Sequence, residues 1–304
     1  MMSLRLRVTA AASRLFFKPW VARATDPVVV REAFRRHARR QHLAPPFMAC
    51  RSGRLGDIPA QWVSCGPVDG PEVIFYIHGG GFVVGHPETH QHIVADLCAR
   101  LRCEAVMPIY RLAPEHPFPA GFEDIRDAYL ALVDSGRPPG RIVLMGDSAG
   151  GNLVMALLGW LNAEGLPMPR AAVPISPVLD LANQAESLKT NAHSEAILVA
   201  ARFDELCEMY LQGAPHDDPR ASPLRANYPN LPPTLFHVCE DEILRDDTLE
   251  MQARLVAQGH DPLVRSWPGG LHVFHLMRGW IPEADRALED IANWIKELRT
   301  QRDS

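Results

Sequence analysis

Ser148, which has a glycine two positions away on either side, is the residue of this sequence whose setting most clearly indicates chemistry. The segment Gly146–Gly150 reads GDSAG and fits Gly-x-Ser-x-Gly, a sharp strand-to-helix turn that exposes a serine hydroxyl. Such a hydroxyl attacks a carbonyl carbon only when a neighbouring base takes its proton. The apolar run 141–145 and the helical pattern 150–163 supply the strand and the helix that this motif requires. Ser148 is therefore the predicted nucleophile.

A glycine triplet lies upstream of this serine, in the segment His78–Gly81. The tetrahedral intermediate of acyl transfer carries an oxyanion that needs fixed N–H donors. Glycines let a backbone come close enough to supply those donors. The triplet directly follows the apolar run 73–77, so we expect it at the same sheet edge as the serine. The oxyanion hole is predicted to comprise the backbone around Gly79, Gly80, Gly81 and Ala149.

An acid is expected after a later strand and before a histidine, because that is the chain order of this motif. Five carboxylates compete between positions 240 and 247, after the predicted strand 234–239. Asp247 and Glu250 resemble an N-terminal capping pair for the following helix. Asp241, the aspartate nearest the strand end, is the predicted partner of the base. Glu240 and Glu242 remain the alternatives.

A histidine on a glycine-containing loop completes the constellation. His272 comes directly after the last predicted strand, 262–267, where the order serine, acid, histidine places the base. His275 is its rival, and position favours His272. We predict that His272 takes the proton of Ser148 and that a covalent acyl-enzyme then forms.

Three further histidines have a spacing that could indicate metal ligands. They are His86, His90 and His92. No acid or cysteine cluster joins them, so we interpret them as exposed or capping residues at the start of a helix and expect no metal.

The elements that must position these residues alternate between short apolar runs and helical stretches, which predicts an α/β fold with a mostly parallel sheet. Residues 1–45 are predicted to be helical, and Pro45 and Pro46 close them. The interval from about 181 to 213 breaks the alternation and is predicted to form one or two helices. We expect residues 1–45 and this insertion to form a helical cap on a catalytic domain that spans 46–304.

The charge of the chain is uneven. Its net charge of −5 gives no argument for nucleic-acid binding, but residues 1–42 carry ten basic and two acidic side chains. Membrane-surface contact of this basic segment is one interpretation, and packing on the acidic body is the one we favour. No run approaches the ~20 apolar residues of a membrane span, and no signal peptide is apparent. We therefore expect a cytoplasmic protein with six reduced cysteines.

Residues 76–276 resemble the bacterial hormone-sensitive-lipase-like esterases, the family IV carboxylesterases of the α/β-hydrolase fold. The resemblance rests on the two glycine motifs, on Tyr110–Ala120 (YRLAPEHPFPA), on Ser176-Pro177 before Asp180, and on Asp241-x-x-Leu244-x-Asp246.

The resemblance implies hydrolysis of short-to-medium-chain acyl esters by Ser148, His272 and Asp241 under a helical cap, with no cofactor. Its small-molecule substrate would be an ester. The same acyl chemistry also serves lactonases, amidases and deacetylases, and related folds include receptors that bind a small ligand without catalysis. An exposed edge of the sheet would permit a homodimer.

Overall fold

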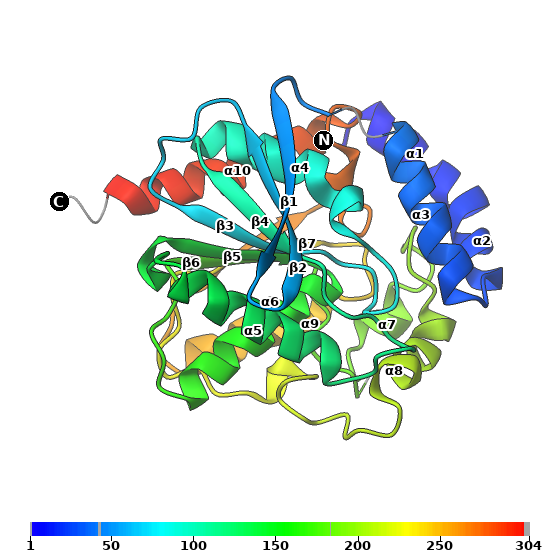
Figure 1. The fold of residues 1–304 in the computed structure, drawn as a ribbon. Helices are drawn as coiled ribbons and strands as arrows, with labels where there is room; N and C mark the ends of the chain where they lie inside the picture. The colour runs from blue at the N-terminus through cyan, green and yellow to red at the C-terminus, as the bar shows by residue number, and fades with distance from the viewer. Residues whose placement is uncertain (1, 42–43, 183, 301–304) are drawn as a thin grey trace.

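The computed structural model describes residues 2–41, 44–182 and 184–300. The described residues form an eight-stranded sheet in the order β1-β2-β4-β3-β5-β6-β7-β8 (Figure 1). Strand β2 pairs antiparallel with β1 and β4, and all other neighbours are parallel. The sheet is therefore mostly parallel, as the sequence predicts. The strands are β1 (Met48–Leu55), β2 (Ile58–Cys65), β3 (Val73–Ile77), β4 (Glu104–Pro108), β5 (Ile142–Asp147), β6 (Ala171–Ile175), β7 (Leu235–Cys239) and β8 (Leu263–Trp267).

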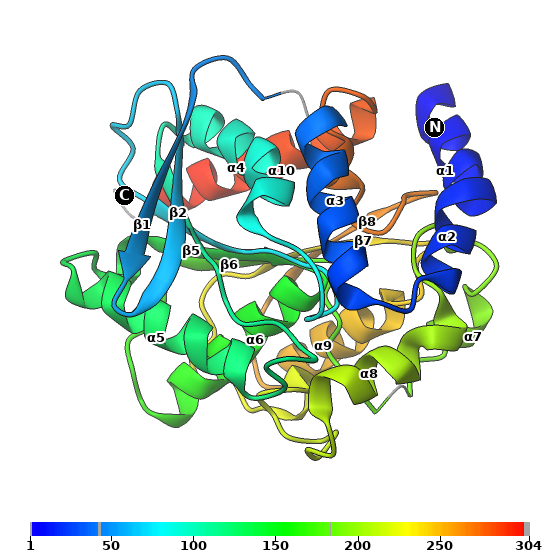
Figure 2. The same cartoon turned by 45° about the vertical axis from the view of Figure 1, so that its right-hand side comes forward.

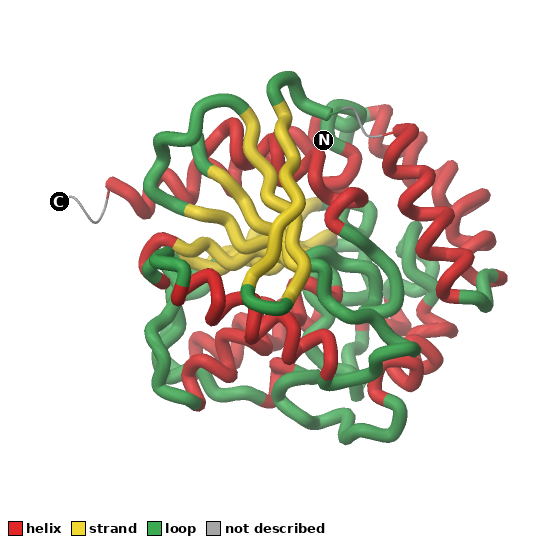
Figure 3. Tube along the Cα trace, in the orientation of Figure 1, coloured by secondary structure: helices red, strands yellow, loops and turns green. Residues whose placement is uncertain are grey.

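Helices cover both faces of this sheet (Figure 3). On one face lie α4 (Pro87–Leu101) and α10 (Pro282–Thr300), and on the other α5 (Ala120–Asp134), α6 (Ala149–Ala163) and α9 (Arg245–Ala257). Strand β3 shows why both are needed, since all five of its residues are buried and alternate between the two cores. Ile74 and Tyr76 belong to the core beneath α4 and α10, whereas Phe75 and Ile77 belong to the other.

Seven strands and the helix after Ser148 begin and end within about two residues of the predicted positions. Strand β1 was not predicted, because it lies at the edge of the sheet and most of its side chains are exposed. It therefore lacks the apolar alternation that identifies a strand in a sequence. Strands β1 and β8 are the two edges, and dimerisation through either one stays a prediction.

The N-terminal helices lie beside the insertion between β6 and β7 (Figure 2). They comprise α1 (Leu4–Ala12), a π-helical turn (Ser13–Phe17), α2 (Lys18–Arg23) and α3 (Pro27–Gln41), and the insertion holds α7 (Ser187–Thr190) and α8 (Phe203–Leu211).

Polar side chains join these two segments. Ser13 Oγ donates to the carbonyl of Ala196 at 2.9 Å, and Lys18 Nζ donates to those of Ala192 and Glu195 at 2.9 and 2.7 Å. These contacts link the two parts of the expected cap, whose boundaries stay a prediction. Within the described ranges, no helix is both long and apolar enough to cross a lipid bilayer.

Candidate active site

The turn between β5 and α6 holds Ser148 in a backbone conformation that residues other than glycine rarely adopt, with φ 52° and ψ −119°. Two glycines make room for this turn. A Cβ on Gly150 would lie 2.0 Å from the carbonyl oxygen of Ile77, and a Cβ on Gly146 would lie 2.5 Å from that of Gly150. Glycine is therefore required on both sides of the serine, and Ser148 stands at the carboxyl end of a central strand.

Ser148, His272 and Glu242 are connected in series by hydrogen bonds. His272 Nε2 lies 2.9 Å from Ser148 Oγ, and His272 Nδ1 lies 2.8 Å from Glu242 Oε2. A carboxylate only accepts, so the neutral ring carries its proton on Nδ1 and leaves Nε2 to accept from the serine. The exposed fractions are 8% for Ser148, 9% for His272 and 1% for Glu242. This arrangement can deprotonate a serine and stabilise the imidazolium that results.

The carboxylate at the histidine is Glu242, so the expectation of Asp241 is wrong. The chain turns directly after β7, and the Glu242 side chain folds back to accept from the amide of Cys239 at 3.0 Å. From there its second oxygen reaches His272. Asp241 is partly exposed and faces a hollow lined by Met2 and Arg14. Closeness to the end of β7 did not identify the residue that contacts His272. The turn after β7 brings Glu242, the third residue after the strand, back over the strand end, and leaves Asp241, the second residue, away from the histidine.

The later aspartates have other partners as well. Asp247 does not cap α9: its Oδ2 accepts from the amides of Leu179 and Asp180 at 2.6 and 3.2 Å. Burial raises the pKa of this carboxyl to about 7, against the opposing effect of those two N–H donors.

A segment far away in the sequence holds the loop that carries Glu242. Asn191 Nδ2 donates to the carbonyls of Glu240 and Glu242, both at 2.9 Å. Ser194 Oγ donates to the carbonyl of Asp241 at 3.0 Å, and Glu195 Oε2 accepts from the amide of Ile243 at 3.2 Å. We call Asn191, Ser194 and Glu195 the loop clamp. No sequence motif marked these residues, and the sequence analysis missed them.

A buried aspartate fixes the glycine triplet. Asp147 Oδ1 accepts from Tyr76 Oη at 2.8 Å and from the amide of Gly79 at 3.1 Å, and its Oδ2 lies 3.2 Å from His90 Nε2. Since its N–H already donates to a carboxylate, Gly79 is not an oxyanion donor, contrary to expectation. The amides of Gly80, Gly81 and Ala149 are the remaining candidates.

The other histidines do not converge on one point. His86 caps α4 by accepting from the amide of Glu88, as expected. His90 and His92 are buried rather than exposed; the first contacts Asp147 and the second lies 3.0 Å from the carbonyl of Leu276. Their burial follows from α4 packing its whole inner face on the sheet.

His275, the rival of His272, turns away from the serine. Its Nε2 lies 3.1 Å from Nδ1 of His237 on β7, whose Nε2 lies 3.1 Å from Asp290. Burial and the neighbouring His237 keep the pKa of His275 well below its ordinary value. Position along the chain thus selected the histidine that contacts Ser148.

The pKa of His272 is raised above its ordinary value of 6.5. Burial lowers it, but the hydrogen bond to Glu242 and the negative charges of Glu242 and Glu195 outweigh that effect. The pKa of His78, by contrast, falls to about 3 through burial and the nearby His90. His272 is therefore the basic imidazole of the site, whereas His78 stays neutral.

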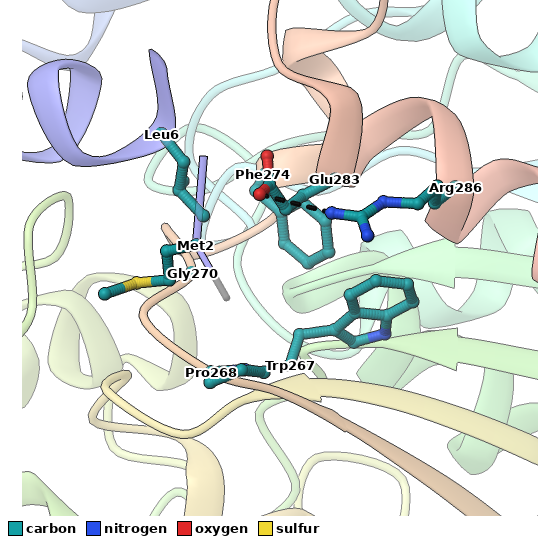
Figure 4. A pocket seen from close by; sticks show the side chains of 8 residues that line it. All are labelled: Met2, Leu6, Trp267, Pro268, Gly270, Phe274, Glu283 and Arg286. Atoms are coloured by element: carbon teal, nitrogen blue, oxygen red, sulfur yellow. Dashed lines mark ion pairs between the residues drawn. The ribbon is translucent and has the colours of Figure 1, made fainter. Parts of the chain in front are cut away.

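A cavity of about 130 Å³ lies behind the His272 loop (Figure 4). Its lining contains none of the three hydrogen-bonded residues, so it is a space between the N-terminal helix and the loop rather than the site of reaction. The residues around it are Met2, Leu6, Trp267, Pro268, Gly270, Phe274, Glu283 and Arg286.

Comparison with known proteins agrees with this geometry. Residues 74–276 match the family described as the α/β-hydrolase fold. An acetyl-hydrolase of Streptomyces hygroscopicus is 37% identical over 235 residues, which are 77% of this chain and 78% of that one. An esterase of Acinetobacter venetianus is 34% identical over 254 residues, 83% and 84% of the two chains.

A solved structure extends the match to the whole fold. It is a crystal structure of an esterase from the bacterial hormone-sensitive lipase family, with a TM-score of 0.91 and 31% identity. The match covers 98% of this chain and 99% of that one, and so includes the N-terminal helices. The chain therefore belongs to the hormone-sensitive-lipase-like esterases of the α/β-hydrolase fold, which are serine carboxylic ester hydrolases.

Proposed function

We propose that this chain hydrolyses short-to-medium-chain carboxylic esters, with Ser148 as nucleophile, His272 as base and Glu242 as the partner of the base. Carboxylic ester hydrolysis is the activity of its family. The assignment of the three roles rests on one observation, the unbroken series of hydrogen bonds from Ser148 Oγ through His272 to Glu242. Six free cysteines support the expectation of a reducing compartment, the cytoplasm.

The reaction runs in two halves. Ser148 Oγ attacks the ester carbonyl carbon while His272 Nε2 takes its proton, and the oxyanion receives N–H donors from Gly80, Gly81 and Ala149. His272 then protonates the leaving alcohol as the carbon–oxygen bond breaks. In the second half His272 deprotonates water, which releases the acid from the serine. Glu242 holds the ring in the required tautomer throughout.

The walls around the glycine triplet support a short acyl chain. A Cβ placed on Gly81 would lie 2.8 Å from Leu206 on α8, so this helix sits directly over the triplet. Phe82 stacks on Tyr210 of the same helix, with ring centroids 3.8 Å apart. A long acyl chain would have to displace these packed side chains.

The variant Ser148→Ala tests the nucleophile. We expect turnover of p-nitrophenyl butyrate to fall by roughly 10⁵- to 10⁶-fold, because the alanine cannot form an acyl-enzyme. A fluorophosphonate should label the unmodified protein and a Ser135→Ala control, whose exposed serine lies at the end of α5, but not Ser148→Ala. Retained turnover or labelling in Ser148→Ala would refute the assignment.

A substrate series tests the acyl group and the class of bond. Rates should be highest for p-nitrophenyl esters of short-to-medium acyl chains and should fall for long ones. An anilide, an acetylated amine and a lactone belong in the same assay. If the anilide, the acetylated amine or the lactone is turned over faster than the esters, the chain is an amidase, a deacetylase or a lactonase, respectively, rather than an esterase.

A further inference from the structure

The N-terminal helix is apolar on two sides. Leu6 and Ala10 point inward and are 1% and 4% exposed, where they pack in one cluster with Leu271 and Phe274 of the His272 loop. A surface helix ordinarily needs only this one apolar stripe. The opposite side carries five further apolar residues, and their exposed fractions run from 39% to 75%. We call this side the outer face; it consists of Leu4, Val8, Leu15, Phe16 and Trp20.

Basic side chains accompany the outer face. Residues 2–25 contain five basic residues and no acidic residue. Arg14 and Lys18 turn inward, where they donate to the carbonyls of Ser194 and Ala192. Arg5, Arg7 and Arg23 are exposed beside the apolar side chains. The outer face therefore combines exposed apolar area with positive charge.

A tryptophan from another part of the chain extends the same surface. Trp280 is 57% exposed, and its indole N–H donates to Thr9 Oγ1 at 3.0 Å. The Arg5 guanidinium carbon lies 5.7 Å from the centroid of its ring. Tryptophan beside arginine is typical of the zone where lipid headgroups meet acyl chains, because the ring is both apolar and a hydrogen-bond donor.

We propose that the outer face, with Trp280, docks on a lipid bilayer that carries anionic headgroups. Exposed leucine, phenylalanine and tryptophan would enter the boundary between headgroups and acyl chains, and the arginines would contact the phosphates. Figures 1 and 2 show α1 and α2 at the periphery of the molecule, where a flat surface can approach them.

Charge favours a lipid surface over a second copy of this chain. A two-fold symmetric dimer through the outer face would place this patch against itself. Arg5, Arg7 and Arg23 of each copy would then approach the same basic side chains, and residues 2–25 offer no acid to pair with them. An anionic headgroup layer complements the patch without that repulsion.

Docking would bring the lipid surface close to the loops of the reaction. The inner side of the same helix packs on the His272 loop, and Arg14 and Lys18 hold the segment that contains the loop clamp. The docking proposal does not depend on the proposed function; together, the two imply that the enzyme takes esters that dissolve in membranes.

Vesicle co-sedimentation tests the proposal directly. The full chain should bind vesicles of phosphatidylcholine that contain phosphatidylglycerol, and should bind pure phosphatidylcholine much less. Added salt should weaken the binding, since it screens exposed charges. The double variants Leu15→Ser/Phe16→Ser and Arg7→Glu/Arg23→Glu should each reduce binding by roughly tenfold or more.

Matched changes elsewhere serve as controls. Val256→Ser on α9 and Lys296→Glu on α10 remove an exposed apolar and an exposed basic side chain, and binding should stay as it was. All variants should keep full turnover of soluble p-nitrophenyl butyrate, which shows that they fold.

Three results would overturn the proposal. Equal binding to neutral and anionic vesicles would show that the arginines of the outer face do not select anionic headgroups. Absence of binding to both kinds of vesicle would show that the outer face does not dock on a lipid bilayer. Light scattering could also show that the unmodified chain is a dimer and that the Leu15→Ser/Phe16→Ser variant is a monomer. That result would mean that the outer face binds a second copy of the chain.

Discussion

The proposed nucleophile, Ser148, and the proposed partner of the base, Glu242, reach their positions in different ways. The turn around Ser148 is determined within a few residues, by glycines that let a strand, a turn and a helix meet without a clash. The position of Glu242 depends on Asn191, Ser194 and Glu195, about fifty residues away in the chain. A short sequence motif therefore predicts the position of Ser148, whereas the position of Glu242 depends on contacts that only the folded structure shows.

The largest effect should come from the turn itself. Gly150→Ala places a Cβ 2.0 Å from the backbone oxygen of Ile77, an atom that cannot move without distorting β3. We expect a loss of about 3 kcal/mol or more in the free energy of unfolding, with activity lost as well. Thermal melting followed by circular dichroism measures this loss.

Gly165→Ala is the matched control. Gly165 also has a positive φ, 65°, but nothing lies within 4 Å of its Cβ position. It should cost only about 1 kcal/mol, the backbone strain of alanine in a left-handed conformation. Similar melting temperatures for the two variants would show that the close approach at Gly150 has little importance.

The second effect distinguishes neighbouring carboxylates. In Glu242→Gln the amide can donate to His272 Nδ1, which favours the tautomer that carries its proton on Nε2. That ring cannot accept the proton of Ser148, so we expect kcat to fall by about 10³- to 10⁴-fold. Asp241→Asn should change kcat by less than about twofold, because the Asp241 side chain does not contact His272. The reverse ranking, measured by steady-state kinetics, would restore Asp241 as the partner.

The same contrast explains which parts of the molecule could be predicted from the sequence. Strand β3 and the strand before Ser148 are fully buried runs, and their hydrophobic residues identify them. Ser148 and His272 follow from motif, loop position and chain order. The choice among three adjacent acids depends on how the chain turns after β7, which no periodicity encodes.

Gly79 shows a similar limit. Its residue type predicts close approach of a backbone, and the structure contains that approach. The group it approaches is the carboxylate of Asp147, not the space beside the serine hydroxyl. The loop clamp lies in the insertion where the alternation of strands and helices breaks, so its role could be found only from contacts.

The smallest effect should come from the loop clamp. Glu195 accepts three backbone N–H groups, from Ile197 and Leu198 on one oxygen and from Ile243 on the other. Glu195→Gln replaces one of these oxygens by an NH₂ group that cannot accept. The loop of Glu242 should shift slightly, and misplacement of this kind costs on the order of 10- to 100-fold in kcat.

The pH profile tells a positioning role from a merely structural one. The charge of Glu195 helps to raise the pKa of His272, and the base acts in its neutral form. Activity of the unmodified enzyme should therefore fall as pH drops through a pKa above 6.5, and in Glu195→Gln this acid limb of kcat/KM should move to lower pH. Glu205→Gln, on the exposed side of α8, should leave the limb in place. A reduced kcat with an unmoved limb would mean that Glu195 only holds the loop through its hydrogen bonds, and that its charge does not contribute to the pKa of His272.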